Sequence, residues 1–120
     1  MPQDYDFVAI RGNDLPIQLR LAPLDATGAQ FDFVCRGPKR PNRLELRRST
    51  QTGTIAMSVD TGATDGPVTV LNFNLAAEDT RRLGEGRVNP YELELRSADG
   101  TEQTLLSGMI TATGGVNADA

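Results

Sequence analysis

The 120-residue sequence contains no histidine and no tryptophan, and it has only one cysteine and one lysine. Without histidine, the chain cannot build a Ser-His-Asp or Cys-His nucleophilic centre, a His-containing zinc site or an imidazole proton shuttle from its own residues. Cys35 alone can form neither an intramolecular disulfide nor a multi-thiolate metal or iron–sulfur site. The commonest enzyme mechanisms are therefore excluded, and we expect Cys35 to be a small buried hydrophobic residue.

Long apolar runs are also missing. No stretch approaches the roughly 18 apolar residues of a membrane-spanning helix, and residues 1–6 (MPQDYD) lack the basic and apolar regions of a signal peptide. The length leaves room for one hydrophobic core. We expect a soluble single domain over residues 1–113, with residues 114–120 as a flexible C-terminal tail, no membrane contact and no export.

Charge is unevenly distributed along the chain. The segment 36–48 holds six basic residues and one acidic residue, so it carries +5 and leaves −9 for the rest of a chain whose total is −4. This predicts an electrostatic docking surface for an acidic partner, a second copy included, or an exposed strand and loop whose charges prevent edge-to-edge aggregation. Nucleic acid is disfavoured, because the rest of the chain repels it and the segment has no aromatic residue to stack on bases. The basic residues are Arg36, Lys39, Arg40, Arg43, Arg47 and Arg48.

Apolar residues mostly alternate with polar ones, the period of half-buried strands, and turn residues interrupt them at short intervals. The pattern predicts an antiparallel, all-β protein. The expected strands cover residues 7–10, 17–21, 31–34, 43–47, 55–59, 68–75, 91–96 and 102–113.

One short helix of about eight residues is expected between the sixth and seventh of these strands. Asn74 is the expected N-cap and Gly84 the C-terminal stop. Leu75 and Leu83 would close one end of the sandwich.

The final strand has apolar residues on both faces. Leu106 and Ile110 share one face, while Leu105 and Met109 share the other. Such a strand is either central beneath the helix or covered on one face by another subunit.

The sharpest enzymatic signal is residues 59–63 (VDTGA), which resemble the Asp-Thr-Gly-Ala motif of retroviral-type aspartic proteases. Those enzymes are histidine-independent dimers in which one such Asp from each chain activates water, so the resemblance implies Asp60 as the catalytic carboxylate. The later apolar-apolar-Gly segment of those proteases leads into a helix, whereas residues 105–108 (LLSG) lead into a strand pattern. A turn-rich loop at residues 60–66 is the favoured interpretation.

Other chemical sites are weaker. Asp60 and Asp65 are close enough to suggest calcium, but the spacing of an EF-hand is missing. Glu92 and Glu94 form a carboxylate pair of the glycosidase type, although Arg96 shares their face and favours a solvated surface. Residues 84–86 (GEG) are too short for a dinucleotide loop. We expect no metal, no cofactor and no catalytic residue.

The second half of the chain contains, in order, residues 75–80 (LAAEDT), 91–95 (YELEL), 98–101 (ADGT) and 105–111 (LLSGMIT). In this order and spacing it resembles small β-sandwich virion proteins of tailed bacteriophages, which are similar to the N-terminal domain of baseplate upper proteins. The matching pattern has a short helix, a Tyr-x-Leu-x-Leu strand, an Asp-Gly turn and a Leu-x-Gly-x-Ile core. Asn89-Pro90 departs from it by interrupting a usually continuous strand, and residues 38–48 are more basic than in the family. Residues 11–14 (RGND) also resemble the Gly-Asp turn after the first strand of that family.

The resemblance implies an immunoglobulin-like β-sandwich with one short helix. It also implies a non-enzymatic virion component, located at the tail, baseplate, fibre base or capsid surface. Its partners would be other virion proteins, and we expect a homo-oligomer in a symmetric assembly. Partner contacts are expected from the basic residues named above together with Leu105 and Met109.

Overall fold

The computed structural model describes residues 3–36, 45–62, 64 and 66–114. Within them the chain forms nine strands and one short helix. Their bounds are β1 Gln3–Asp4, β2 Phe7–Ile10, β3 Leu15–Leu21, β4 Gln30–Arg36, β5 Glu45–Ser49, β6 Ala56–Asp60, β7 Val68–Leu75, α1 Ala77–Thr80, β8 Gly86–Arg96 and β9 Glu102–Thr113.

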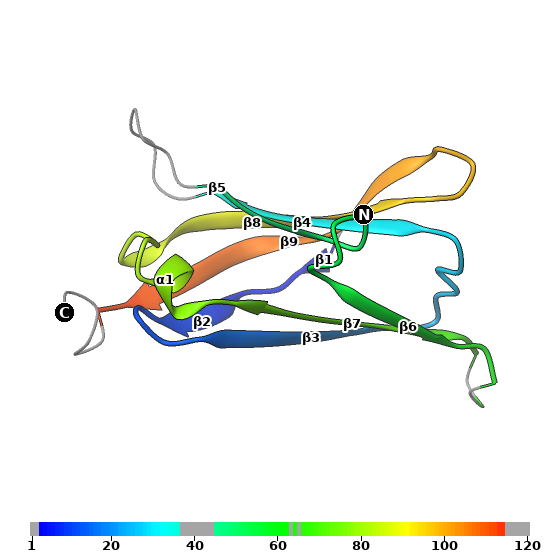
Figure 1. Cartoon of the computed structure of the whole chain (residues 1–120), viewed down its shortest axis with the longest axis horizontal. Coiled ribbons are helices and arrows are strands. Elements are labelled where there is room, and N and C mark those ends of the chain that lie inside the picture. Colours follow the sequence, from blue (N-terminus) through cyan, green and yellow to red (C-terminus); the bar gives the residue numbers. More distant parts are fainter. Residues whose placement is uncertain (1–2, 37–44, 63, 65, 115–120) are drawn as a thin grey trace.

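The strands form two sheets that lie in two layers (Figure 1). The larger sheet has the order β1-β9-β8-β4-β5, with β2 also paired to β9, and the smaller sheet has the order β3-β7-β6. The pairs are antiparallel except that β1 and β2 run parallel to β9. The all-β prediction is confirmed, and β9 lies inside its sheet between β8 and the two N-terminal strands.

The core lies between the sheets because each strand turns alternate side chains inward. Phe33 of β4 is fully buried and contacts Phe73 of β7 with ring centroids 4.8 Å apart, so one aromatic pair joins the two layers. Cys35 is also fully buried, as expected, and this burial raises the pKa of its thiol to about 12. The thiol therefore stays protonated and unreactive at neutral pH.

The helix is shorter than expected and begins later. Asn74 is not its N-cap, because it is the exposed penultimate residue of β7 and pairs with Pro16. The backbone N–H of Ala77 instead donates to the carboxylate of Asp14 at 2.7 Å, a capping partner that comes from the loop between β2 and β3. Leu75 and Leu83 are both buried, as expected, but neither lies in the helix: Leu75 ends β7 and Leu83 follows α1, which lies at one end of the sandwich (Figure 1).

Asn89-Pro90 does not interrupt β8, contrary to the expectation. The strand is continuous from Gly86 to Arg96, and a register shift between Arg87 and Asn89 absorbs one extra residue, Val88. Proline within a sheet is commonly found at such bulges, where the ladder is already locally disrupted. Asn89 is fully buried and Pro90 is exposed, so the two residues face opposite sides of the sheet.

Candidate docking face

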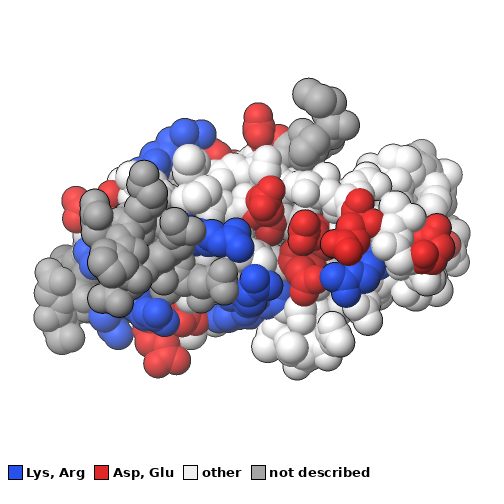
Figure 2. Space-filling view, turned by 90° about the horizontal axis from the view of Figure 1, so that it is seen from above, with Lys and Arg blue, Asp and Glu red and all other residues white. Residues whose placement is uncertain are grey.

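The expected basic surface is only partly formed by described residues. Lys39, Arg40 and Arg43 lie outside them. Arg36 ends β4 and Arg47 lies exposed on β5, and both belong to the outer face of the larger sheet. Figure 2 looks onto this face and shows acidic side chains beside basic ones, so the described part of the face has mixed charge.

Arg48 has contacts within the fold. Its Nε donates to the carbonyl oxygen of Asn74 at 3.0 Å, and its Nη2 donates to Oδ2 of Asp79 at 2.7 Å. The side chains of this ion pair are each 18% exposed. Arg48 therefore ties β5 to the end of β7 and to α1, which is a structural role, and the partner contact expected for it stays a prediction.

Leu105 and Met109 do not lie together. A register shift in the β8–β9 ladder falls between Leu93 and Glu94, and Leu105 is the unpaired residue of β9 at this point. Its side chain packs against the edge of the core, beside Leu24. Met109 instead points outward, as the alternation predicted, while Leu106 and Ile110 are buried on the core side.

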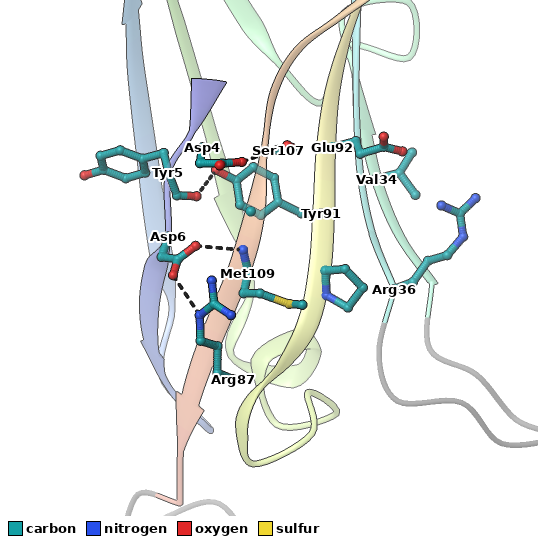
Figure 3. Close-up of a pocket in the computed structure, with 12 residues that line it drawn as sticks. Asp4, Tyr5, Asp6, Val34, Arg36, Arg87, Tyr91, Glu92, Ser107 and Met109 are labelled. Atoms are coloured by element: carbon teal, nitrogen blue, oxygen red, sulfur yellow. Dashed lines mark hydrogen bonds and ion pairs between the residues drawn. The ribbon is translucent and has the colours of Figure 1, made fainter. Parts of the chain in front are cut away.

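An open groove of about 740 Å³ runs across the outer face around Met109 (Figure 3). Its apolar lining comes from Met109, Pro90 and Val34. Asp4 and Asp6 stand on one side, at the junction of β1 and β2, which we call the acidic wall. Arg36 stands on the opposite side, at the end of β4, and we call Arg36 together with Arg47 of the neighbouring β5 the basic wall.

The register of the sheet places these side chains in rows across the strands. Pro90 pairs with Met109, and the backbone N–H of Met109 donates to Asp6 Oδ1 at 3.0 Å. Two residues along, Glu92 pairs with Ser107, and Ser107 pairs with Asp4. Each row therefore runs from the acidic wall across β9 and β8 toward the basic wall.

The acidic wall is held by a small set of contacts around Gly108. The N–H of Tyr5 donates to the carbonyl oxygen of Ser107 at 2.9 Å, and the hydroxyl of Tyr91 donates to the carbonyl oxygen of Tyr5. Burial raises the pKa of Tyr91, so its hydroxyl remains a hydrogen-bond donor at neutral pH. No sequence motif marks Asp4, Tyr5 or Asp6 as site residues, although a glycine inside an apolar strand is a signal for close backbone approach.

Asp6 connects the acidic wall to both β9 and β8. The hydrogen bond from the backbone of Met109, and then the one from the Arg87 side chain at 2.9 Å, hold the pKa of Asp6 below its ordinary value of 3.8. Asp6 is therefore ionised at neutral pH and fixed in place by two donors.

No protein-family model matches the chain, and no curated protein matches it. Within the part of the chain that the structure describes, no helix is long and apolar enough to cross a membrane. The described residues also contain no group of three or more side chains placed to hold a metal ion.

Exposed apolar side chains extend the groove toward the N-terminal edge of the sheet. Val8 on β2 is 67% exposed, and Val88 on β8 is 43% exposed. Val8 pairs with Thr111 of β9, two residues beyond Met109, so it shares the outer face.

Asp60 lies far from this face, at the end of the edge strand β6 in the smaller sheet. It is exposed, and its Oδ1 accepts a hydrogen bond from the N–H of Gly62 at 2.9 Å. This contact closes a turn of the kind that aspartate commonly forms after a strand. Ala63 and Asp65, which belong to the same loop, lie outside the described residues.

The contribution of Asp6 to stability should depend on pH. A carboxyl whose pKa is lower in the folded state stabilises the fold above its unfolded value and loses this contribution as the pH falls through the folded value. Asp6→Asn should therefore lower the urea midpoint at pH 7, and the difference from the parent should shrink as the pH falls below 3.8. Glu94→Gln, an exposed carboxylate on the same face, is the control. A pH-independent difference for Asp6→Asn would contradict the assignment.

Proposed function

We propose that the chain is a non-enzymatic structural protein of a tailed-bacteriophage virion that docks onto neighbouring subunits. It would be a component of the tail, baseplate or fibre base, or a capsid decoration. The observation that carries the proposal is the outer face of the larger sheet, where an apolar groove lies between an acidic and a basic wall. Such a face fits a protein surface better than a small molecule, because it is broad, open and bordered by charges of both signs.

We also infer an immunoglobulin-like sandwich. The order β3-β7-β6 corresponds to strands B, E and D of that fold, and the adjacent β9, β8 and β4 correspond to G, F and C. β5 then takes the place of the extra strand beside C in variable-type domains. The main difference from that fold lies in the N-terminal strands β1 and β2, which pair in parallel with β9 instead of joining the smaller sheet.

The phage assignment is supported by the resemblance of the second half of the chain. Its matching segments fall on β7, α1, β8 and β9, which are consecutive elements that frame both the plugged end of the sandwich and the groove. A rigid sandwich that offers one face in many copies can assemble through repeated weak contacts, because avidity compensates for a small interface in each copy.

Virion incorporation is the direct test. Mass spectrometry of purified particles should detect the chain, and Arg47→Glu should reduce its incorporation about tenfold, because a reversed charge opposes an acidic partner surface. Arg20→Glu reverses an arginine that is also exposed, on β3 of the smaller sheet, and should leave incorporation unchanged. Absence of the chain from particles would overturn the proposal.

The rival function is a dimeric aspartic protease that uses Asp60. It predicts peptide cleavage with an acid optimum in the parent protein and none in Asp60→Asn. The structural role of Asp60 in its turn with Gly62 predicts instead that neither protein cleaves. Cleavage lost on this substitution would replace our proposal with the rival.

A further inference from the structure

We propose that one neighbour of this chain is a second copy, packed face to face through the same groove. The two larger sheets would be related by a two-fold axis that runs parallel to the strands and passes between β8 and β9. This inference rests on the proposed function, since it names one of the subunits onto which the chain docks. An isologous contact of this kind requires that the face be complementary to itself, and the register allows that to be examined residue by residue.

The first complementarity is apolar. An axis between two neighbouring strands places β8 of one copy over β9 of the other. Pro90 pairs with Met109 within the chain, so Pro90 of one copy meets Met109 of the second copy. Both residues line the groove, and their contact would bury its apolar lining from both sides.

The next row along the strands is polar. Glu92 pairs with Ser107 within the chain, so the axis brings the Glu92 carboxylate to the Ser107 hydroxyl of the second copy. Within the chain this hydroxyl donates to Oδ1 of Asp4 over 3.4 Å, and in the dimer it would turn to the Glu92 carboxylate, which accepts from it. Val88 lies on the far side of the apolar row and meets the Thr111 methyl region in the same way, because Thr111 is opposite the bulge that holds Val88.

The charges of the two walls favour a two-fold axis parallel to the strands over one that runs across them. The rotation carries β4 over the junction of β1 and β2, so the basic wall of one copy faces the acidic wall of the other, and Arg36 meets Asp6. A two-fold axis across the strands would instead stack β4 on β4 and the N-terminal strands on each other. Arg36 would then face the same arginine and Asp4 the same aspartate, and like charges repel.

The angle between the larger sheets of the two copies limits how many rows of side chains can meet across the interface. Two packed sheets cross at about 30° because each is twisted. The rows nearest the axis, which contain Pro90, Met109, Glu92 and Ser107, therefore meet most directly, while Arg47 at the edge strand β5 falls outside the contact.

Cross-linking tests the geometry. Ser107→Cys should form covalent dimers with a short bifunctional maleimide, because the two copies of this position lie close to the axis. Ser58→Cys is the matched control, since Ser58 is exposed on β6 in the smaller sheet. The native Cys35 is fully buried and should not react. Equal cross-linking of both variants would indicate random collision and overturn the proposal.

Solution mass tests the dimer itself. At about 100 µM, the parent should have twice the 12.9 kDa mass of one chain by light scattering. Arg36→Asp should weaken the dimer at least tenfold, whereas Arg20→Asp should not. A dimer unaffected by Arg36→Asp would refute the orientation. A monomeric parent that is nevertheless present in virions would overturn this inference and leave the proposed function intact. A dimeric parent that is absent from virions would overturn the proposed function and leave the dimer intact.

Discussion

Replacing Gly108 with alanine is expected to detach the N-terminal strand from the larger sheet. A Cβ at this position would lie 2.1 Å from the carbonyl oxygen of Tyr5 and 2.9 Å from its carbonyl carbon, which are backbone atoms. The N-terminal segment must therefore move, and the hydrogen bonds that Tyr5 forms with Ser107 and Tyr91 cannot both survive. We expect the free energy of unfolding to fall by about 2 kcal/mol and Tm by roughly 10 °C.

Gly114→Ala is the control for this substitution. Its Cβ would meet only the Glu85 side chain, with the carboxylate oxygen 3.4 Å away, and a flexible side chain can move. We expect a change within about 0.5 kcal/mol. Thermal unfolding gives the stability, and hydrogen exchange at the amides of Tyr5 and Met109 reports local release of the strand. Equal effects of the two substitutions would contradict the close approach at Gly108.

The same substitution links the fold to the docking face. Asp4 and Asp6, which form the acidic wall, belong to the segment that Gly108 admits, and Asp6 accepts from the backbone of Met109. Gly108→Ala should therefore impair dimerisation even at temperatures where the sandwich remains folded. The glycine is a positioning residue for the groove as well as a stabilising one.

The strands could be predicted from the sequence because a strand that is buried on one face has apolar residues at every second position. Tyr91, Leu93 and Leu95 are buried, while Glu92 and Glu94 between them are exposed, as the pattern required. The turn at residues 97–100 also follows the expectation, since the Gly100 N–H donates to the Ser97 carbonyl oxygen at 2.9 Å. Local periodicity and turn chemistry are sufficient for these features.

Long-range partners could not be predicted in the same way. The cap of α1 comes from Asp14, 63 residues before the N–H that it accepts from, so no local signal for it exists near Asn74. Arg48 belongs to a strongly basic segment and was therefore expected at the surface, but it forms an ion pair with Asp79 of α1, which is distant in the sequence. The positions of the charged residues in the sequence do not show which of them form ion pairs within the fold.

The groove is the clearest example of this limit. Its walls come from the β1–β2 junction and from β4, and its lining from β8 and β9, which only the sheet order brings together. Met109 was expected to face outward and does. Strict alternation predicts that Leu105 lies on the same face as Met109. The register shift in the ladder turns Leu105 toward the edge of the core instead, and alternation alone cannot predict such a shift.

Asn89→Ala should have the larger effect on global stability. Asn89 is fully buried, and its side chain forms three hydrogen bonds: Oδ1 accepts from the Gly84 N–H at 2.9 Å, and Nδ2 donates to the carbonyl oxygens of Gly84 at 2.8 Å and Ile110 at 2.9 Å. Alanine would leave these three backbone groups without their partner and open a cavity, so we expect a loss of about 3 kcal/mol, measured by urea unfolding.

Two further variants show which part of that loss belongs to the hydrogen bonds. Asn72→Ala removes an exposed asparagine that accepts one hydrogen bond, from Gln18 at 3.0 Å, and should change stability by no more than about 0.5 kcal/mol. Asn89→Asp keeps the volume but turns an oxygen toward two carbonyl oxygens, so it should be at least as destabilising as alanine. A tolerated Asn89→Asp would show that packing, and not donation to Gly84 and Ile110, makes this residue necessary. Because Asn89 fixes the segment between α1 and the bulge, its loss should also disorder Arg87 and Val88 on the docking face.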